Sequence, residues 1–317
     1  INNLDKKKYE VIPIYLDKDN NWYTCENFQI EKFGELPKKT KPIKNVFEFL
    51  KKLDCVFPVM HGKMGEDGSI QGFLEVLGIP YVGCNILASS VCMDKIYTKA
   101  ILKNIANVSP DVTIIKENKD LYYYDDLKLV KKVNIKDIDK LINEKLNYPV
   151  FIKPSRFGSS VGVTKVKNGK SLKKALLEAL KYDNEVLIEK EIKGRELECA
   201  VLCGKALEIG EVLSAEEFYD YDAKYQNEES KTVIPANIPK EIKNNIKDIA
   251  QLAFRATNCK GLARVDFFLE NKTNKIIINE INTMPGFTDI SMYPKLAEAA
   301  GISYKKLLDI LIKDALK

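Results

Sequence analysis

Two carboxylates and a carboxamide stand in strand-like runs near the end of the chain. Asp266 lies in Ala-Arg-Val-Asp-Phe-Phe, and Glu280 and Asn282 lie in Ile-Ile-Ile-Asn-Glu-Ile-Asn. Residues two apart on a strand share a face, so Glu280 and Asn282 should point together while Ile281 points into the core. Oxygen ligands of this kind suit Mg²⁺, which takes few protein ligands and completes its shell with phosphate and water. Taken alone, the pattern would more simply be the solvated face of an antiparallel sheet.

Two further groups near these carboxylates are suited to binding an anion. Arg264 lies two residues before Asp266 and should share its face, where its charge could neutralise a developing oxyanion. The chain then leaves the sheet through Asn-Thr-Met-Pro-Gly, ending at Gly286, and the backbone N–H groups of this turn could bind the same anion. On its own, a Pro-Gly pair indicates only a turn.

A third set of residues is typical of phosphate binding. Glycines and serines, among them Ser159 and Ser160, separate strand-like runs at residues 150–152 and 161–166, and Lys153 stands at the base of the loop. The loop offers unhindered N–H groups and hydroxyls, and the lysine adds a point charge. A Walker loop or a dinucleotide fingerprint would run from strand into helix, so this pattern predicts a flexible β-hairpin, here called the glycine hairpin. An isolated match would more simply be an ordinary turn.

Residues 189–196 follow the glycine hairpin and read as a strand that runs into a turn. In a cleft between domains, this backbone would hydrogen-bond an adenine, and Glu196 would accept hydrogen bonds from the ribose hydroxyls. A charged surface hairpin is an equally good interpretation of the segment by itself.

His61 is the only histidine of the chain. It ends an apolar run, and a glycine-rich loop then enters a helix at Ser69. Strand ends are where α/β proteins bind ligands, so a functional His61 is about as well supported as a structural or exposed one.

Strand-like and helix-like runs alternate ahead of these motifs, which indicates an α/β fold. The pattern predicts strands at residues 9–15 and 55–60 and helices at 46–52 and 69–77, the last ended by Gly78. Residues 116–145 read as a connector followed by a helix, and residues 215–230 as a candidate functional loop. The other predicted elements are a helix at 172–182 capped by Ser171, strands at 185–192, 263–269 and 275–281, and helices at 238–258, 294–300 and 304–316.

Length and composition narrow the class of protein. With 317 residues and 45% hydrophobic content, the chain should form two or three globular domains. No apolar run approaches the ~20 residues of a membrane span, and no leader pattern is seen, so we expect a cytoplasmic protein without a membrane partner. The seven cysteines show no metal or disulfide spacing and should be reduced core thiols. The 50 basic and 45 acidic residues are interspersed, which gives little support to a nucleic-acid partner.

Five motifs, taken in order, resemble those of the D-alanine–D-alanine ligases. They lie at residues 61–72, 93–95, 152–160, 219–225 and 279–286. The likeness covers nearly the whole chain in order and in spacing, and Lys63 with residues 92–95 also resembles the vancomycin-resistance ligases. It implies an ATP-grasp fold of three α/β domains: an N-terminal domain at residues 1–91, a central lid domain at 92–184 and a C-terminal catalytic domain at 185–317. It also implies a homodimer that works in peptidoglycan precursor synthesis.

The same resemblance implies a role for each matching residue. His61 would help to place the first D-alanine, Arg264 and the Gly286 amide would bind the oxyanion, and Ser291 would meet the carboxylate of the second D-alanine. The implied ATP-binding residues are Lys95, Lys153 and Lys224 at the phosphates, Ser159 and Ser160 in the lid, Glu189, Lys190 and Ile192 at adenine, and Glu196 at ribose. The implied ligands of two Mg²⁺ ions, with Mn²⁺ as an alternative, are Asp266, Glu280 and Asn282.

The implied reaction runs through an acyl phosphate. The carboxylate of the first D-alanine attacks the γ-phosphate of ATP, and the amine of the second D-alanine then displaces phosphate. Tyr225, which would bond to Ser159, and an apolar Met292 favour D-alanine as the second substrate. D-serine and D-lactate, the substrates of the vancomycin-resistance type, are the alternatives.

The start of the chain departs from the family pattern. The family opens with a strand, a glycine-rich loop and a glutamate that holds the ammonium of the first substrate, whereas this sequence begins at Ile1 with what resembles the second strand. We therefore expect an N-terminal domain without its first strand. Either the sequence is a fragment, or the strand is absent and the protein is an inactive nucleotide-binding remnant.

Overall fold

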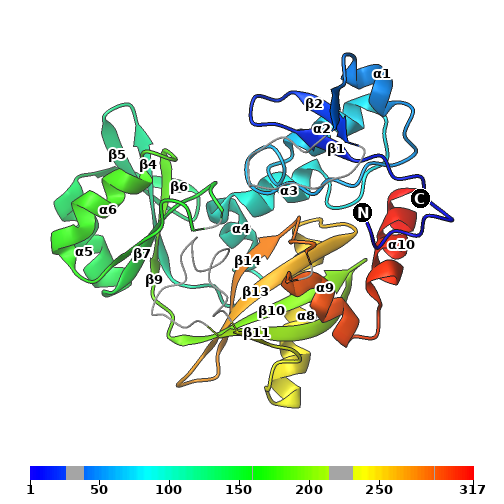
Figure 1. Ribbon diagram of the computed structural model, residues 1–317. Helices are drawn as coiled ribbons and strands as arrows, with labels where there is room; N and C mark the ends of the chain where they lie inside the picture. The colour runs from blue at the N-terminus through cyan, green and yellow to red at the C-terminus, as the bar shows by residue number, and fades with distance from the viewer. Residues whose placement is uncertain (26–38, 159, 214–230, 289) are drawn as a thin grey trace.

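The protein is a mixed α/β molecule with three sheets, seen in a computed structural model that describes residues 1–25, 39–158, 160–213, 231–288 and 290–317. Figure 1 shows three lobes, with helices α3 (Ile86–Met93) and α4 (Lys95–Leu102) running between them. No helix in these ranges is long and apolar enough to cross a membrane.

The first lobe holds a small antiparallel sheet and two helices packed over a core of Leu50, Ile70, Leu74 and Ile79. Helix α2 begins and ends where the sequence predicts, and Gly78 closes it in the left-handed conformation with φ 68°. The elements of this lobe are β1 (Ile14–Leu16), β2 (Trp22–Cys25), β3 (Thr40–Pro42), α1 (Val46–Leu50) and α2 (Ser69–Leu77).

Two predicted strands of this lobe are shorter than expected. The run at residues 9–15 becomes a strand only from Ile14, and the run at 55–60 forms a single parallel bridge between Val56 and Tyr81. Val56 exchanges backbone hydrogen bonds of 2.9 Å with Pro80 and Val82 on one side. Within the described ranges no strand pairs with its other side, so the bridge does not extend into a ladder.

The second lobe is a six-stranded antiparallel sheet in the order β6-β5-β4-β9-β7-β8, with α5 and α6 packed against its core. The predicted glycine hairpin is confirmed, because β7 and β8 pair antiparallel through Val150↔Val166. Ser171 stands at the N-cap position of α6 but makes no side-chain cap bond. The elements are β4 (Asp111–Glu117), β5 (Asp120–Asp125), β6 (Lys128–Val133), α5 (Ile135–Lys145), β7 (Val150–Pro154), β8 (Thr164–Val166), η1 (Gly169–Ser171), α6 (Leu172–Ala179) and β9 (Glu185–Lys190).

The helix expected in the later part of residues 116–145 is confirmed as α5, but the connector expected ahead of it is wrong, because that stretch contains the β5–β6 hairpin. Asp126 and Leu127 form its turn, both with positive φ, at 50° and 63°. Strand β6 is an edge strand on which only Val133 is buried. The alternation that would reveal a half-buried strand is therefore missing from its sequence.

The third lobe is a five-stranded antiparallel sheet in the order β12-β11-β10-β13-β14, covered by α8 and α9. Its core also receives Ala88 and Cys92 from α3 and Leu102 from α4, so these two helices pack with this sheet. The elements are β10 (Gly194–Leu202), β11 (Lys205–Leu213), β12 (Lys231–Val233), α8 (Lys240–Ala256), β13 (Leu262–Glu270), β14 (Ile276–Asn282), α9 (Met292–Ala299) and α10 (Tyr304–Ala315).

The N-terminal segment lies against the last helix, as Figure 1 shows where the blue chain end meets α10. The Tyr9 hydroxyl donates to Asp309 over 2.7 Å, and Lys305 pairs with Asp5 over 3.1 Å. This contact fixes the first lobe to the third across nearly the whole length of the chain.

The cysteines are free thiols, as expected, but not all of them belong to the core. Five are buried, whereas Cys55 is half-buried and Cys203 is exposed in the turn between β10 and β11.

Candidate active site

Three carboxylates form a row across neighbouring strands of the third lobe. Glu198 on β10 is the register partner of Asp266 on β13, and Asp266 is the partner of Glu280 on β14. Asn282 and Arg264 are partners one step further along the same two strands. The alternation predicted for β14 is confirmed, because Ile281 is buried while Glu280 and Asn282 are only partly covered.

Arg264 is the cation that holds this row together. Its Nε and NH2 donate to the two oxygens of Asp266 over 2.7 and 2.6 Å, and Nε lies 3.1 Å from Glu198. Burial opposes the charge of the guanidinium, but the Asp266 and Glu198 carboxylates outweigh burial and raise the pKa of Arg264. The planar fork is thus fixed in one orientation on the site.

The three residues expected to bind Mg²⁺ are chemically suited to that ion. Asp266 and Glu280 face each other on adjacent strands, and Asn282 Nδ2 lies 2.9 Å from Asp266 Oδ2. In the described part of the chain, no cluster of three or more His, Cys, Asp or Glu side chains is arranged to hold a metal. The set is therefore two carboxylates and an amide, an incomplete oxygen shell of the kind that Mg²⁺ fills with phosphate and water.

The two lysines expected at the phosphates are Lys153 on the second lobe and Lys95 on α4. The Glu280 carboxylate of the row affects the pKa of both. Lys95 opens α4, and its Nζ donates to the carbonyl of Phe157 in the glycine hairpin over 2.6 Å. Burial lowers the pKa of Lys95, an effect that the charge of Glu280 opposes. Lys153 is the last residue but one of β7, and its Nζ lies 2.5 Å from Glu189. Burial opposes its charge, but Glu189 and Glu280 outweigh burial and raise the pKa of Lys153.

The residues expected at adenine and ribose follow one another from β9 into β10. Glu189 is buried, with both carboxylate oxygens bound by side chains of the protein. Lys190 is exposed, and Ile192 and Glu196 are partly covered. Ser160, in the glycine hairpin, has a positive φ of 60°. Their roles toward nucleotide stay predictions.

His61 lies in the same loop as Glu66, a partly covered acid that sequence reasoning missed. His61 is exposed by surface area, yet the atoms around its ring and the charge of Arg264 lower its pKa. Glu66 accepts a hydrogen bond from the Gly62 N–H, and burial raises its pKa to about 7. The charge of Glu280 also raises the pKa of Glu66, whereas the charges of Arg264 and Lys95 lower it.

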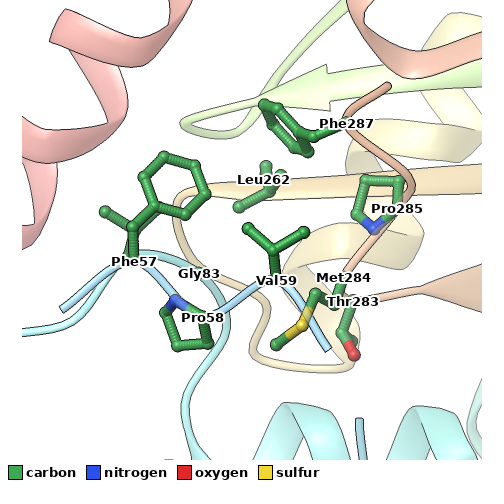
Figure 2. Close-up of a pocket in the computed structure, with 10 residues that line it drawn as sticks. Phe57, Pro58, Val59, Gly83, Leu262, Thr283, Met284, Pro285 and Phe287 are labelled. Atoms are coloured by element: carbon green, nitrogen blue, oxygen red, sulfur yellow. The ribbon is translucent and has the colours of Figure 1, made fainter. Parts of the chain in front are cut away.

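The turn after β14 brings two predicted site residues together. A Cβ added at Gly286 would come within 2.6 Å of the Ser291 hydroxyl, which accepts a hydrogen bond from the Thr288 N–H over 3.0 Å. Figure 2 shows the neighbouring apolar contact, in which Val59 and Phe57 face Met284, Pro285 and Phe287. The gap left there is about 10 Å³, so the first lobe packs tightly against the turn.

Three predicted site residues, Ser159, Lys224 and Tyr225, lie outside the described residues, as does the candidate loop at 215–230. Met292, expected beside the second substrate, is instead buried at 7% exposure in the core with Tyr293 and Leu296. Its position as the first residue of α9 turns it toward β11, where a Cβ at Gly210 would lie 2.8 Å from its sulfur.

The residues missed by sequence reasoning had weak signals. Glu198 lies two residues after Glu196 on the same strand and hence on the same face. Lys99 lies four residues after Lys95 on α4 and hence on the same side of the helix. Glu66 lies in the motif at residues 61–72, in which the sequence predicted a role only for His61.

The whole chain is similar to known proteins. Family models described as D-ala D-ala ligase N-terminus and C-terminus match residues 1–84 and 123–313. A D-alanine–D-alanine ligase from Clostridium acetobutylicum is 45% identical, over 99% of this chain and 90% of the relative. The chain belongs to the D-alanine–D-alanine ligase family.

Solved structures of the ligase family have the same fold. VanG D-Ala:D-Ser ligase from Enterococcus faecalis matches with a TM-score of 0.81 and 34% identity, over 99% of this chain and 92% of that one. A D-alanine–D-alanine ligase from Bacillus anthracis complexed with ATP matches with a TM-score of 0.75 and 32% identity, over 99% and 89% of the two chains. The likeness expected from the motifs is confirmed, including that to the vancomycin-resistance branch.

Proposed function

We propose that the protein is an ATP-dependent ligase that joins two D-alanines for peptidoglycan precursor synthesis. The observation that carries the proposal is the electrostatic convergence of two lobes, since Lys95 and Lys153 both interact with the Glu280 carboxylate on β14. Cations for the phosphates of a nucleotide thus face the oxygen ligands of its metal ion. The names of the curated relatives, at 42 to 52% identity, support the same activity.

ATP would lie between the glycine hairpin and the sheet of the third lobe. Lys95 and Lys153 would bind its phosphates, Ser160 would cover them, and Glu196 would accept from the ribose. The Bacillus anthracis structure supports nucleotide binding by this fold, since it holds ATP. The backbone near Lys190 and Ile192 would read the adenine.

Asp266, Glu280 and Asn282 would hold Mg²⁺, which supplies charge neutralisation at the phosphates when it is bound. The protein itself contributes alignment, because these donors project from the same face of β13 and β14. Two ions would require further oxygen ligands from the phosphates.

The first bond-forming step depends on position, whereas the second also requires the ammonium group of the second D-alanine to lose a proton, to solvent or to a nearby base, before the amine attacks. The carboxylate of the first D-alanine attacks the γ-phosphorus and releases ADP, and an acyl phosphate forms. The amine of the second D-alanine attacks the acyl carbon, and the tetrahedral oxyanion would be stabilised by Arg264 and the Gly286 N–H. Phosphate then leaves with one oxygen of the original carboxylate. His61 and Ser291 would orient the two substrates.

We also propose the three-domain organisation of the family, with one boundary moved. Strand β9 (Glu185–Lys190) belongs to the six-stranded sheet, so the central domain should extend to about residue 190 rather than end at 184. A homodimer remains a proposal, which light scattering would test directly.

D-alanine–D-serine ligation is the second candidate, favoured by the similarity to VanG. Met292 does not decide between the two, because it is buried in the core. Met292→Arg should therefore unfold α9 locally rather than change substrate preference, since an arginine buried without a partner is strongly destabilising. A competition between D-alanine and D-serine as second substrate tests the assignment, and equal incorporation of D-serine would contradict our choice of D-alanine.

The activity is tested by phosphate release from ATP with Mg²⁺ and D-alanine. We expect release that depends on D-alanine and is not supported by L-alanine. Nucleotide binding without D-alanine-dependent phosphate release would instead favour an inactive remnant.

A further inference from the structure

A buried lysine on α4 makes contacts that the roles proposed above do not use. Lys99 has a side chain 7% exposed, and its Nζ lies 2.6 Å from Glu189 Oε1, 3.2 Å from Asp111 Oδ1 and 2.7 Å from the Ser109 carbonyl oxygen. The Ser109 hydroxyl oxygen also accepts from Nζ over 3.1 Å, so four oxygens surround an ammonium group that has three protons. Lys99 therefore sits in a closed, fully bonded position one helical turn after Lys95.

The two carboxylates that Lys99 contacts repel each other. Asp111 on β4 and Glu189 on β9 are direct register partners across an antiparallel pair. Like charges placed opposite on neighbouring strands destabilise a sheet. Burial and Glu189 raise the pKa of Asp111, whereas Lys99 lowers it.

Glu189 connects Lys99 and Asp111 to Lys153 in the proposed phosphate site. Its Oε1 accepts from Lys99 and from the Ser109 hydroxyl, both over 2.6 Å, and its Oε2 lies 2.5 Å from Lys153 Nζ. At the two ends of this chain of contacts, the Lys153 side chain is 18% exposed and the Asp111 side chain is 30% exposed, whereas Lys99 and Glu189 are buried. The four charges Lys99, Lys153, Asp111 and Glu189 sum to zero.

We propose that Lys99 is a positioning residue for nucleotide binding, which cancels one of two carboxylate charges, those of the buried Glu189 and the partly buried Asp111, so that the charge of Lys153 remains available to the phosphates. Lys99 itself does not touch the nucleotide. Without it, Lys153 would face two carboxylates alone, and the cluster would present a net negative charge to ATP. This inference rests on the proposed function for the identity of the ligand.

The test is the affinity for a non-hydrolysable ATP analogue, measured by calorimetry on the full chain with Mg²⁺. Lys99→Met should raise the dissociation constant at least tenfold, and in turnover the KM for ATP should rise while kcat stays within about threefold. Lys103→Met is the matched control, because Lys103 lies one turn further along and pairs with Asp126 at the surface. It should leave affinity and turnover unchanged.

A second variant separates charge from packing. Lys99→Met combined with Asp111→Asn removes one charge of each sign, so affinity should return to within about threefold of the unmodified protein. If Lys99 only filled space, the double variant would bind no better than the single one. An unchanged affinity in Lys99→Met, or no recovery in the double variant, would overturn the proposal.

Two further measurements keep the result unambiguous. If Lys99→Met does not fold, Asp111→Asn provides the test, because it removes one negative charge from the cluster while Lys99 stays in place. The ATP analogue should then bind at least roughly threefold more tightly, and an equal or weaker affinity would overturn the proposal. Calorimetry needs no ligase activity, so a chain that binds the analogue but forms no dipeptide contradicts the proposed function and leaves this inference standing.

Discussion

Asp266 is the residue at which the charges of the site meet, because it receives both bonds of the Arg264 fork and faces Glu280 across the strand pair. The sequence alone predicts that Asp266, Glu280 and Asn282 share a face, since strand alternation fixes which way each side chain points. It does not predict Glu198 as the second partner of Arg264, because that contact depends on β10 lying next to β13.

Glu280→Gln should abolish turnover and leave the fold intact, because it would remove a charged ligand from the proposed Mg²⁺ site without changing side-chain volume. We expect activity at limiting Mg²⁺ to fall at least 100-fold, measured by phosphate release. The free energy of unfolding, measured in urea, should change by less than about 1 kcal/mol. Near-normal activity would remove Glu280 from the metal site.

Asp266→Asn should lose activity in the same assay and also lose stability. The Arg264 guanidinium would still pair with the Glu198 carboxylate but would lose its ion pair with Asp266. Breaking a hydrogen bond to a buried charge costs about 1 to 3 kcal/mol of stability. A variant that is inactive and as stable as the unmodified protein would show that the Arg264–Asp266 pair contributes nothing to the fold.

Glu66 gives the site a pH dependence that can be measured without substrate. Burial raises its pKa from 4.5 to about 7, so the folded state binds the proton more tightly than the unfolded state. The stability gained from this proton is fully present below pH 4.5 and is lost as the pH rises through about 7. Relative to Glu66→Gln in metal-free buffer, the unmodified protein should lose at most about 3 kcal/mol between pH 5 and pH 8. A pH-independent difference would contradict the burial of this carboxyl group.

At the scale of elements, the positions of Lys95 and Lys153 depend on the contacts made at the start of α4. Asp94 is its N-cap and is 6% exposed, with Oδ1 accepting from the Ile96 N–H over 3.0 Å and from the Ser155 hydroxyl over 2.6 Å. Ser155 follows the last residue of β7, so this one carboxylate ties α4 to the glycine hairpin.

Asp94→Ala should therefore cost both stability and nucleotide affinity. Loss of a cap with a buried partner should lower the free energy of unfolding by about 1 to 3 kcal/mol. Asn134→Ala is the control, because Asn134 caps α5 in a capping box at the surface of the second lobe. It should lose about 1 kcal/mol and keep its affinity for the ATP analogue. Equal affinities in the two variants would show that α4 is placed by other contacts.

Elements were predictable where the chain carries a strong period or a stop signal. Helix α2 ends at Gly78 and the glycine hairpin forms as expected, since both depend on local residues. The β5–β6 hairpin could not be found in this way, because its edge strand is almost entirely exposed. The short β1 and the bridge at Val56 depend on which strands lie beside them, and a single sequence does not show this.

At the scale of the whole molecule, the site is assembled from all three lobes. His61 and Glu66 come from the first, Lys153 from the second, and the carboxylate row from the third, with α4 between them as Figure 1 shows. Ordered motifs predicted this assembly through the family resemblance. They did not predict the Lys99–Glu189 bond, because it joins residues 90 positions apart that no local pattern connects.

The central claim is that one D-alanine carboxylate is phosphorylated by ATP before the peptide bond forms. Supplying D-alanine with both carboxylate oxygens as ¹⁸O, together with ATP and Mg²⁺, and analysing the products by mass spectrometry tests this most directly. We expect D-alanyl-D-alanine in an amount equal to the phosphate released, with one ¹⁸O atom in each phosphate. Phosphate without ¹⁸O would mean that water and not the carboxylate attacks ATP, and would contradict this order of steps.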